Sequence, residues 1–513
     1  MANAARVIPN LYRDSVSLMQ LSAMLAALPG IEQASAIMAT PANIALLAEA
    51  GLAPGRAAPG PNDLLIAVRG RNPAALEAAL AAAVAELDKA PLSPTGGGPA
   101  RMAPRSLQMA FAAAPSANLA LISTPGEYAA AEAMKALRLG LNAMLFSDNV
   151  ELADEIELKN FAKAHDLLVM GPDCGTAIIN GVPLGFANAV QRGAIGVVGA
   201  SGTGTQQVTC LVHRHGAGIS HAIGTGSHDL HQQVGGVTML QGIRALARDK
   251  ATKVIVLVSK PPAPEVAQTV LAAARGCGKP VVVNFVGAAP ESIRGANLHP
   301  ATTLANAALA AVALSRGRKP VKARAEKLPP VGIGRMARSQ RYLRGLYSGG
   351  TFCYEACAML AASLGEVWSN APVDPKLRLA NVRKSKGHTL IDLGDDEFTR
   401  GRPHPMIDFR LRNQRILAEA GDPDVAVILL DVVLGYGAHA DPAAELAPVL
   451  VKAQAAARRK RRSVALVGFV CGTELDPQGL ERQERALRAA GMILTDSNAQ
   501  AVRHAASIVV KRR

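Results

Sequence analysis

Short apolar runs alternate with helical patterns from Asn118 to the end of the chain. The runs are rich in Val, Ile and Leu, are bounded by Gly and Pro turns, and have the length of buried strands. Strands that alternate with helices in this way predict parallel sheets with helices on both faces. The predicted strands are Leu119–Ser123, Asn142–Phe146, Leu167–Met170, Ile195–Val198, Ile219–Ile223, Val254–Val258, Val281–Val286, Leu343–Tyr347, Thr389–Leu393, Val425–Leu430, Val464–Val470 and Met492–Thr495.

The first part of the chain has a different pattern. Strands are predicted at Arg6–Tyr12, Ile31–Ala39 and Asp63–Val68, with helices between and after them. Asn72 and Pro73 open the last helix, because Asn is a good N-cap and Pro fits the first helical turn. This order of elements predicts a small ferredoxin-like α+β domain in which no residue suggests catalysis.

Two stretches without a periodic pattern divide the chain. Pro91–Pro104 is rich in Pro and Gly, and Arg316–Pro330 is basic and contains Pro, as linkers often are. We predict a ferredoxin-like domain at 1–90, a linker at 91–105, a doubly wound Rossmann-like domain at 106–193, a flavodoxin-like domain at 194–316, a linker at 317–335 and a second flavodoxin-like domain at 336–513.

The clearest candidate for chemistry is the loop Gly199–Thr205, which joins an apolar run to a helical pattern. A loop of small residues at such a junction presents backbone N–H groups and the positive end of the helix dipole to an anion. We therefore expect a phosphate or carboxylate site at Ser201, Gly202, Thr203, Gly204 and Thr205. No Gly-Lys-Ser/Thr follows, so the loop is not a Walker A motif. The alternative is an ordinary strand–helix turn with Ser and Thr caps.

The two flavodoxin-like parts repeat each other. A strand that ends in a Gly-rich loop occurs at Val197–Thr203 and again at Leu346–Thr351, and later strands match in the same order. An internal duplication of this size favours two similar sheets. Packed about a pseudo-twofold axis, they would aim both loops at one phosphoryl group, with Ser348, Gly349, Gly350 and Thr351 as the second half of the site. The alternative is two independent domains with unrelated loops.

Composition excludes several classes of protein. Apolar residues make up 49% and charged residues 19% of the chain, as in globular proteins. No apolar run is long enough for a membrane span and no signal peptide is evident, so we expect a cytoplasmic protein without a membrane partner. The six cysteines form no CxxC pair and no metal pattern, so no metal site is predicted.

The net charge of +15 favours small anionic substrates. The densest basic block, Arg458–Arg462, lies between a helical pattern and a buried strand, which indicates the solvated end of a surface helix. No aromatic stacking platform or zinc pattern accompanies it, so nucleic acid is not expected as a partner.

The chain resembles the succinyl-CoA synthetase superfamily in Gly171-Pro172-Asp173-Cys174, Gly199–Thr205, Gly224-Thr225-Gly226, Val254–Val258 and Ser348–Thr351. It is closest to the FdrA family, which it resembles in Ser220–Gly226 and Gly401–Asp408. The resemblance covers nearly the whole chain. It implies a CoA-binding domain at 106–193 and two ligase domains at 194–316 and 336–513, and two loops that grip a phosphohistidine.

Several positions depart from the superfamily pattern. No ATP-grasp domain is present, and the histidine nearest to the phosphohistidine position is His299, without the expected Gly-His-Ala-Gly. Lys260 stands where the superfamily has a carboxylate, and a lysine there would bind phosphate. The first loop of the CoA-binding part, Ser123–Tyr128, has one glycine where a dinucleotide fingerprint needs three, which argues against NAD and leaves CoA in question.

The FdrA resemblance implies a subunit of an oxamate carbamoyltransferase of purine and allantoin nitrogen catabolism. That enzyme interconverts oxalurate and phosphate with oxamate and carbamoyl phosphate, as an oligomer with partner subunits. In this reading Lys260 or Arg294 adds positive charge, Arg402 binds the substrate carboxylate, and His404 or His221 moves a proton. Gly224, Thr225 and Gly226 would help to bind the substrate.

Two other functions stay open. One is an NDP-forming acyl-CoA synthetase that uses an ATP-grasp partner, with His299 as phosphoryl carrier. The other is a non-catalytic scaffold that keeps the fold and an anion site.

Asp392, Asp395 and Asp396 offer too few spaced oxygen ligands for a magnesium site.

Overall fold

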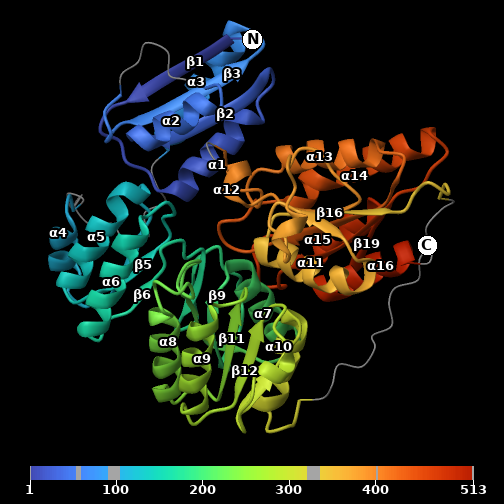
Figure 1. Cartoon of the computed structure of the whole chain (residues 1–513). Helices are drawn as coiled ribbons and strands as arrows, with labels where there is room; N and C mark the ends of the chain where they lie inside the picture. Colours follow the sequence, from blue (N-terminus) through green and yellow to red (C-terminus); the bar gives the residue numbers. More distant parts are fainter. Residues whose placement is uncertain (1, 53–58, 90–103, 321–335, 400–401, 511–513) are drawn as a thin grey trace. The chain divides into compact units, whose positions relative to one another are not determined.

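The computed structural model describes residues 2–52, 59–89, 104–320, 336–399 and 402–510, which form two compact units (Figure 1). Unit 1 comprises Met1–Val169 with Asp396–Asp408, and unit 2 comprises Met170–Asp395 with Phe409–Arg513. Most of the two predicted linkers, 91–103 and 321–335, lies outside the described residues. The predicted domain boundaries stay a prediction.

The amino-terminal part of unit 1 is an antiparallel sheet with the strand order β1-β3-β2 (Figure 1). Helices α1 and α3 pack on one face, over Ile66 and Val68, and α2 packs on the other through Leu47. β1 and β2 run in the same direction on either side of β3, as in ferredoxin-like folds. The elements are β1 (Ala2–Ile8), α1 (Ser15–Ala26), β2 (Ile31–Met38), α2 (Pro41–Glu49), β3 (Leu64–Gly70) and α3 (Pro73–Leu87).

The first strand differs from the prediction, because β1 spans Ala2–Ile8 and not Arg6–Tyr12. Pro9 has no N–H for the ladder and Asn10 adopts a left-handed φ of 49°, so the chain turns there. The predicted start of α3 is confirmed, since Ala75 N donates to Asn72 Oδ1 over 2.8 Å. A cap is a local interaction and is therefore readable from sequence, whereas a turn inside an apolar run is not.

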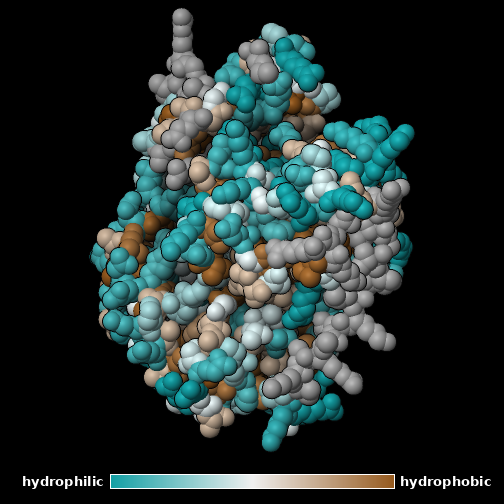
Figure 2. Space-filling model, turned by 45° about the vertical axis from the view of Figure 1, so that its right-hand side comes forward, coloured by the Kyte–Doolittle hydropathy of each residue, from teal (hydrophilic) through white to brown (hydrophobic). Residues whose placement is uncertain are grey.

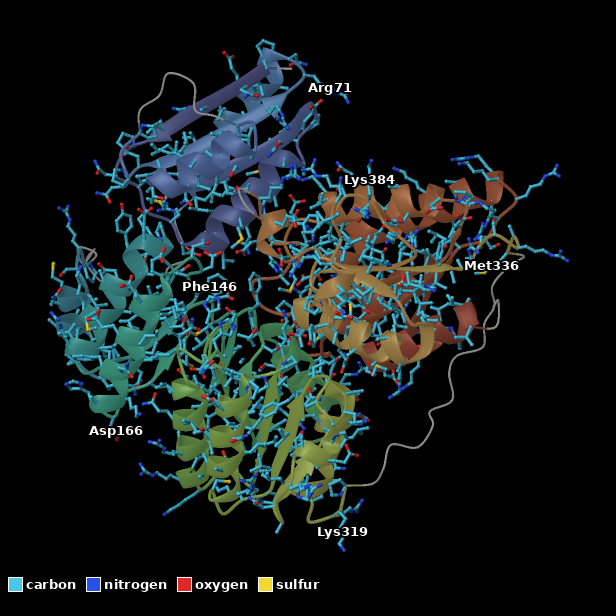
Figure 3. The ribbon with its side chains drawn as sticks, in the orientation of Figure 1. Arg71, Phe146, Asp166, Lys319, Met336 and Lys384 are labelled. Atoms are coloured by element: carbon cyan, nitrogen blue, oxygen red, sulfur yellow. The ribbon has the colours of Figure 1, made fainter. Side chains whose placement is uncertain are left out.

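The other sheet of unit 1 has the order β4-β5-β6. Strands β4 and β5 are parallel. Phe146 directly follows β5, and Asp166 precedes β6 at the opposite end of this part (Figure 3). Alanines at 129, 133 and 136 are fully buried and let α5 approach the sheet closely. The elements are α4 (Leu107–Ala113), β4 (Leu119–Ile122), α5 (Gly126–Arg138), β5 (Asn142–Leu145), α6 (Leu152–Ala164), β6 (Val169–Met170) and, later in the chain, α12 (Asp396–Thr399).

Unit 2 begins with a sheet in the order β13-β12-β11-β9-β10-β7-β8. Its strands β9 to β13 are parallel, and the hairpin β7–β8 adds antiparallel strands at one edge. The elements are β7 (Thr176–Ile179), β8 (Val182–Gly185), β9 (Arg192–Ala200), α7 (Gly202–Arg214), β10 (Ile219–Gly224), α8 (Val237–Arg248), β11 (Val254–Ser259), α9 (Pro264–Arg275), β12 (Val281–Phe285), η1 (Pro290–Ser292), β13 (Leu298–Pro300) and α10 (Leu304–Ser315).

The second sheet of unit 2 is parallel throughout and has the order β15-β16-β14-β17-β18-β19. The sequence missed β15, β13 and the hairpin β7–β8, because such short strands show no period. The elements are β14 (Tyr342–Tyr347), α11 (Gly350–Leu364), β15 (Val367–Ser369), η2 (Pro375–Leu377), β16 (His388–Asp392), α13 (Arg410–Gly421), β17 (Val425–Val433), α14 (Pro442–Arg459), β18 (Ala465–Cys471), α15 (Leu480–Ala489), β19 (Met492–Thr495) and α16 (Asn498–Val510).

The two sheets share one strand order. From edge to centre, β13-β12-β11-β9-β10 in the first sheet corresponds to β19-β18-β17-β14-β16 in the second. The sheets contact each other through α7 and α10 on one side and α11 and α16 on the other. The predicted fold class is confirmed: parallel α/β domains follow a small α+β domain.

A buried polar network also joins the two halves of unit 2. Asn188 Nδ2 donates to Leu434 O over 2.9 Å and to Asp476 Oδ2 over 2.8 Å. Ala189 N donates to Asp476 Oδ1, and Thr473 Oγ1 returns a bond to Ala189 O over 2.6 Å. Because these groups are buried, losing one partner would leave others unsatisfied, which holds the two sheets in one arrangement.

Charged side chains lie mostly at the surface, and hydrophilic residues cover most of the face in Figure 2. In the basic block, Arg458, Arg459, Lys460 and Arg461 are exposed as predicted, whereas Arg462 is buried and donates to carbonyls at the end of α13. In the part of the chain that the structure describes, no helix is long and apolar enough to cross a membrane.

Candidate functional site

In the first loop, Gly199–Thr205, helix α7 already begins at Gly202, and Ser201 is its N-cap. The hydroxyl of Ser201 accepts a hydrogen bond from Gly204 N over 3.0 Å. Gly202 is exposed, and a Cβ built there would meet only Thr176 Oγ1, at 3.4 Å, so the start of α7 is open. No described residue accepts a hydrogen bond from the N–H of Gly202 or Thr203. These two donors and the helix dipole can therefore receive an anion.

The second loop is organised differently, because a buried carboxylate fills it. Asp431 Oδ1 accepts from Ser348 N over 2.8 Å, and Oδ2 accepts from Ser348 Oγ and Gly349 N over 2.8 and 2.9 Å. Arg412 balances the charge with Nη1 at 3.1 Å from Oδ1, and both side chains are at most 1% exposed. The N–H groups of Ser348 and Gly349, which the sequence predicts as phosphate donors, are thus already occupied.

The two loops meet in unit 2. Ser201 Oγ lies 2.6 Å from Thr351 Oγ1, and either hydroxyl can be the donor. A Cβ on Gly349 would stand 3.0 Å from Thr203 Oγ1 and 2.6 Å from the ring of Phe352, so only glycine fits there. The structure therefore brings the predicted groups 201–205 and 348–351 together, whereas their role in phosphate binding stays a prediction.

Asp392 stands beside the second loop, at the end of β16. A Cβ on Gly350 would collide with Asp392 Oδ2, which places the carboxylate at the first turn of α11. Burial raises the pKa of Asp392 to about 6, against the opposing charge of Lys260. Lys260 directly follows β11, is exposed and favours the charged form of Asp392, whereas its role in binding phosphate stays a prediction. The sequence offered one signal for Asp392, an acid at the end of a buried strand.

Two buried hydroxyls nearby have no partner among the described residues. Thr205 Oγ1, on α7, lies against Gly199, and Ser259 Oγ lies at the end of β11, which pairs with Ala200. Both residues are at most 1% exposed. Buried hydroxyls without partners are uncommon in folded proteins, and these two lie at the carboxyl edge of the first sheet, closed off from solvent.

The structure places His221 and His299 away from these loops. His221 lies within β10, accepts from Asn180 N over 3.0 Å and faces Asp249 at 3.9 Å, and burial lowers its pKa. His299 lies on the edge strand β13 opposite Val282, whereas β12 continues to Phe285. At 3.3 Å per residue, His299 is roughly 10 Å short of the carboxyl edge. Neither histidine is brought to the two helix N-termini.

The predicted substrate residues fall into two groups. A Cβ on Gly224 would collide with Thr176 O and Cys174 Sγ, and Gly226 has a φ of 86° with Pro172 O in the way of any side chain. The two glycines let the backbone at 224–226 pass close to the backbone at 172–176, and Thr225 between them is fully buried. Arg294 is exposed, and its Nε donates to Glu291 O over 2.9 Å.

Arg402 and His404 belong to unit 1. Arg402 is exposed, and its N–H donates to Thr399 O. His404 is half-buried, and its Nδ1 accepts from Met406 N over 3.2 Å. The turn between the two prolines is therefore ordered by its own hydrogen bonds, and any catalytic role of these side chains stays a prediction.

In unit 1, the loop Ser123–Tyr128 follows β4. Ser15, at the start of α1, donates from its N–H to Ser123 Oγ over 3.3 Å and from its hydroxyl to Ser123 O over 3.2 Å. A Cβ on Gly126 would collide with Asp148 O. The start of α1 thus contacts the loop at which the resemblance implies CoA binding, and a role of this loop in binding CoA stays a prediction.

Three protein families match parts of the chain. The family described as CoA-ligase matches residues 346–508, the CoA binding domain family matches residues 190–287, and the family described as "AllF, heavy metal-associated domain" matches residues 1–102. The CoA binding domain match covers β9 to β12, and not 106–193, for which the sequence predicts that domain. Together with the strand order, the matches show a ligase fold like that of succinyl-CoA synthetase.

One relative matches nearly the whole chain. "Uncharacterized protein YahF" of Escherichia coli (strain K12) is 44% identical over 495 residues, which are 96% of this chain and 95% of that protein. The "Succinate--CoA ligase [ADP-forming] subunit alpha" of Aquifex aeolicus (strain VF5) is 28% identical over 153 residues, which are 28% of this chain and 48% of that subunit. This second match spans about half of the subunit.

Solved structures match more weakly. The apo form of the dinucleotide forming Acetyl-coenzyme A synthetase 1 of Ca. Korarchaeum cryptofilum is 15% identical and covers 77% of this chain and 82% of that chain, with a TM-score of 0.32. A likeness at this level carries no argument about how the domains are arranged.

The name of the amino-terminal family implies a heavy metal, which the residues present do not fit. Heavy metals favour thiolate and imidazole ligands. Residues 1–102 contain neither cysteine nor histidine, since the first of each in the chain are Cys174 and His165. Within the described residues, no group of three or more His, Cys, Asp or Glu side chains could hold a metal ion.

Proposed function

Because this chain belongs to the family of Escherichia coli YahF, and carries both a CoA-ligase and a CoA binding domain match, we propose that it transfers an acyl group between phosphate and a second nucleophile. The observation that carries the proposal is the contact of 2.6 Å between Ser201 Oγ and Thr351 Oγ1. It joins two helix N-termini, and so two positive dipole ends, at one place.

The phosphate site is proposed at the start of α7. Gly202 N, Thr203 N and the exposed ammonium of Lys260 supply donors and charge. Gly350 N and Thr351 N, on α11, remain for the same anion, because Asp431 occupies the donors before them. Such preorganised donors stabilise the charge that develops on phosphate as the acyl bond breaks.

The leading candidate for the second nucleophile is the thiol of CoA. The CoA-ligase and CoA binding domain matches favour an acid–thiol ligase-like enzyme. No ATP-grasp pattern is found in the sequence, so this reading needs a partner subunit that makes the acyl phosphate from a small acid and ATP. We expect such an assembly to be a cytoplasmic oligomer.

The second candidate is the FdrA-type reaction, in which the nucleophile is the amide nitrogen of oxamate and the donor is carbamoyl phosphate. The position of His299 favours it, since this histidine lies on the edge strand β13 opposite Val282 and not after β12, where the resemblance places the phosphohistidine. A ready-made acyl phosphate needs no phosphohistidine. Arg294, which belongs to unit 2 like the two loops, is proposed to bind the oxamate carboxylate.

One experiment separates the candidates. The purified protein is given acetyl or succinyl phosphate with CoA in one arm, and carbamoyl phosphate with oxamate in the other. Phosphate release with thioester absorbance supports the first candidate, and phosphate release with oxalurate supports the second. Binding of inorganic phosphate without turnover, even with the natural partner subunits, would assign the chain a scaffold role and overturn both.

A further inference from the structure

Asp392 is a carboxylate at this site that is neither fully bonded nor neutralised by an arginine of the described residues. Its Oδ1 accepts from Gly394 N over 3.0 Å, whereas no described residue donates to Oδ2. The side chain is 5% exposed, and Oδ2 faces Gly350 at the first turn of α11. Asn370 fixes the backbone from both sides, since it accepts from Asp392 N and donates to Asp392 O.

The groups that face Asp392 come from several elements. Lys260, after β11, favours its charged form, whereas Asp395, after β16, and Asp431, on β17, oppose it. Cys353, one turn into α11, is fully buried and interacts electrostatically with Asp392. Asp431 is balanced by Arg412, so the exposed ammonium of Lys260 is the main compensating charge for Asp392.

We propose that Asp392 is the proton carrier of the acyl transfer proposed above, on which this inference rests. The acceptor X–H gives its proton to Asp392 Oδ2 while X attacks the acyl carbon and the C–X bond forms. The bond between that carbon and the phosphate oxygen then breaks. Asp392 passes the proton to the departing oxygen, and phosphate leaves as HPO₄²⁻. The carboxylate is regenerated, and no other reactant is needed.

The position of Asp392 fits this role better than that of His221 or His299. Oδ2 adjoins the N-terminus of α11, which contacts the N-terminus of α7 through Thr351 and Ser201. His221 and His299 lie within β10 and on the edge strand β13. Burial raises the pKa of Asp392 to about 6, so the group can both take and give a proton near neutral pH.

The test uses sulfate, which keeps one charge state from about pH 5 to 8, so that any pH dependence of its binding comes from the protein. Ionisation of Asp392 beside the anion should weaken sulfate binding in the full-length protein by roughly tenfold as the pH rises through about 6. In Asp392→Asn the affinity should be flat and should match the low-pH value of the wild type. Asp374→Asn, an exposed cap of η2, is the matched control and should keep the wild-type curve.

The outcomes separate the two proposals. No binding of sulfate or phosphate at any pH means that the proposed function fails. Binding with a curve that Asp392→Asn leaves unchanged, or a flat curve in the wild type, overturns the role of Asp392 alone. In whichever acyl transfer reaction the protein performs, Asp392→Asn should lower kcat by about 10²–10⁴-fold, while KM for the acyl phosphate should not rise. An equal rise in KM with unchanged kcat would also contradict the proton-carrier role.

Discussion

The two loops of unit 2 stand at the same place in duplicated sheets, yet different side chains lie beneath them. Val258 pairs with Gly199, two residues before the cap of α7. Leu430 pairs with Leu346, which places Asp431 beside Tyr347, two residues before the cap of α11. Where the first loop rests on an apolar methyl group, the second rests on a carboxylate.

The neighbouring strand on the other side repeats the contrast. Gly224 pairs with Gly199 in the first sheet, and Asp392 pairs with Tyr347 in the second. The first helix terminus is thus flanked by Val258 and Gly224 and can accept an external anion, whereas the second is flanked by two acids. The two halves share their strand order, yet one helix terminus is open, where we propose the anion site, and the other is supported by acids.

The largest effect is expected when the first loop is made like the second. Val258→Asp would place a buried carboxylate beneath Gly204, without an arginine to balance it. We expect the free energy of unfolding to fall by about 3–5 kcal/mol and phosphate affinity to fall roughly 100-fold, because a like charge would occupy the site. Urea unfolding and phosphate titration measure both. Val258→Thr, of similar shape, should keep phosphate binding. An unchanged phosphate affinity in Val258→Asp would contradict the view that an apolar residue at 258 leaves the first loop open to an anion.

Removing the carboxylate of the second loop should cost nearly as much stability. Asp431→Ala leaves Arg412 buried without its partner and frees Ser348 N and Gly349 N. A loss of about 3–5 kcal/mol is expected in chemical denaturation. The double variant Asp431→Leu, Arg412→Met should recover most of it, since neither charge then remains buried. Equal losses in the single and double variants would mean that the ion pair does not organise the loop.

A smaller effect, of opposite sign, is expected at Asp392. Its native pKa of about 6 lies above the ordinary 3.8, so the native state binds the proton more tightly than the unfolded chain. Below about pH 4 the carboxyl is protonated in both states, so it does not lower the free energy of unfolding. Above about pH 6 it is charged in both states, and its full destabilising effect is reached. Asp392→Asn should raise the free energy of unfolding by about 2–3 kcal/mol at pH 8 and leave it unchanged near pH 3.5. Loss of stability at pH 8 would indicate a structural carboxylate.

The smallest effect concerns the caps. Ser201 caps α7 with its hydroxyl, whereas Gly349 caps α11 without a side chain. Ser201→Ala should cost about 1 kcal/mol, of which part is the bond to Thr351. A double-mutant cycle with Thr351→Val measures that part by thermal unfolding. Strict additivity of the two changes would show that the loops touch without coupling.

Much of the fold was readable from the chain. Apolar runs, Gly turns and caps such as Asn72 are local, and they revealed most of the parallel strands and the duplication. The contact between 201–205 and 348–351 followed from the repeat, because similar sheets place similar loops alike. The first strand was shifted and the short edge strands were missed, since neither has a periodic signal.

The roles of individual side chains were less accessible. Ser348 and Gly349 looked equivalent to the first loop, and His221 and His299 looked available, because sequence shows residue types and not what a distant strand places beside them. Local patterns along the chain predict two parallel sheets with a Gly loop before a helix in each. That Asp431 fills one loop while Val258 leaves the other open is visible only in the folded chain, because these contacts arise when strands far apart in the sequence pair in register.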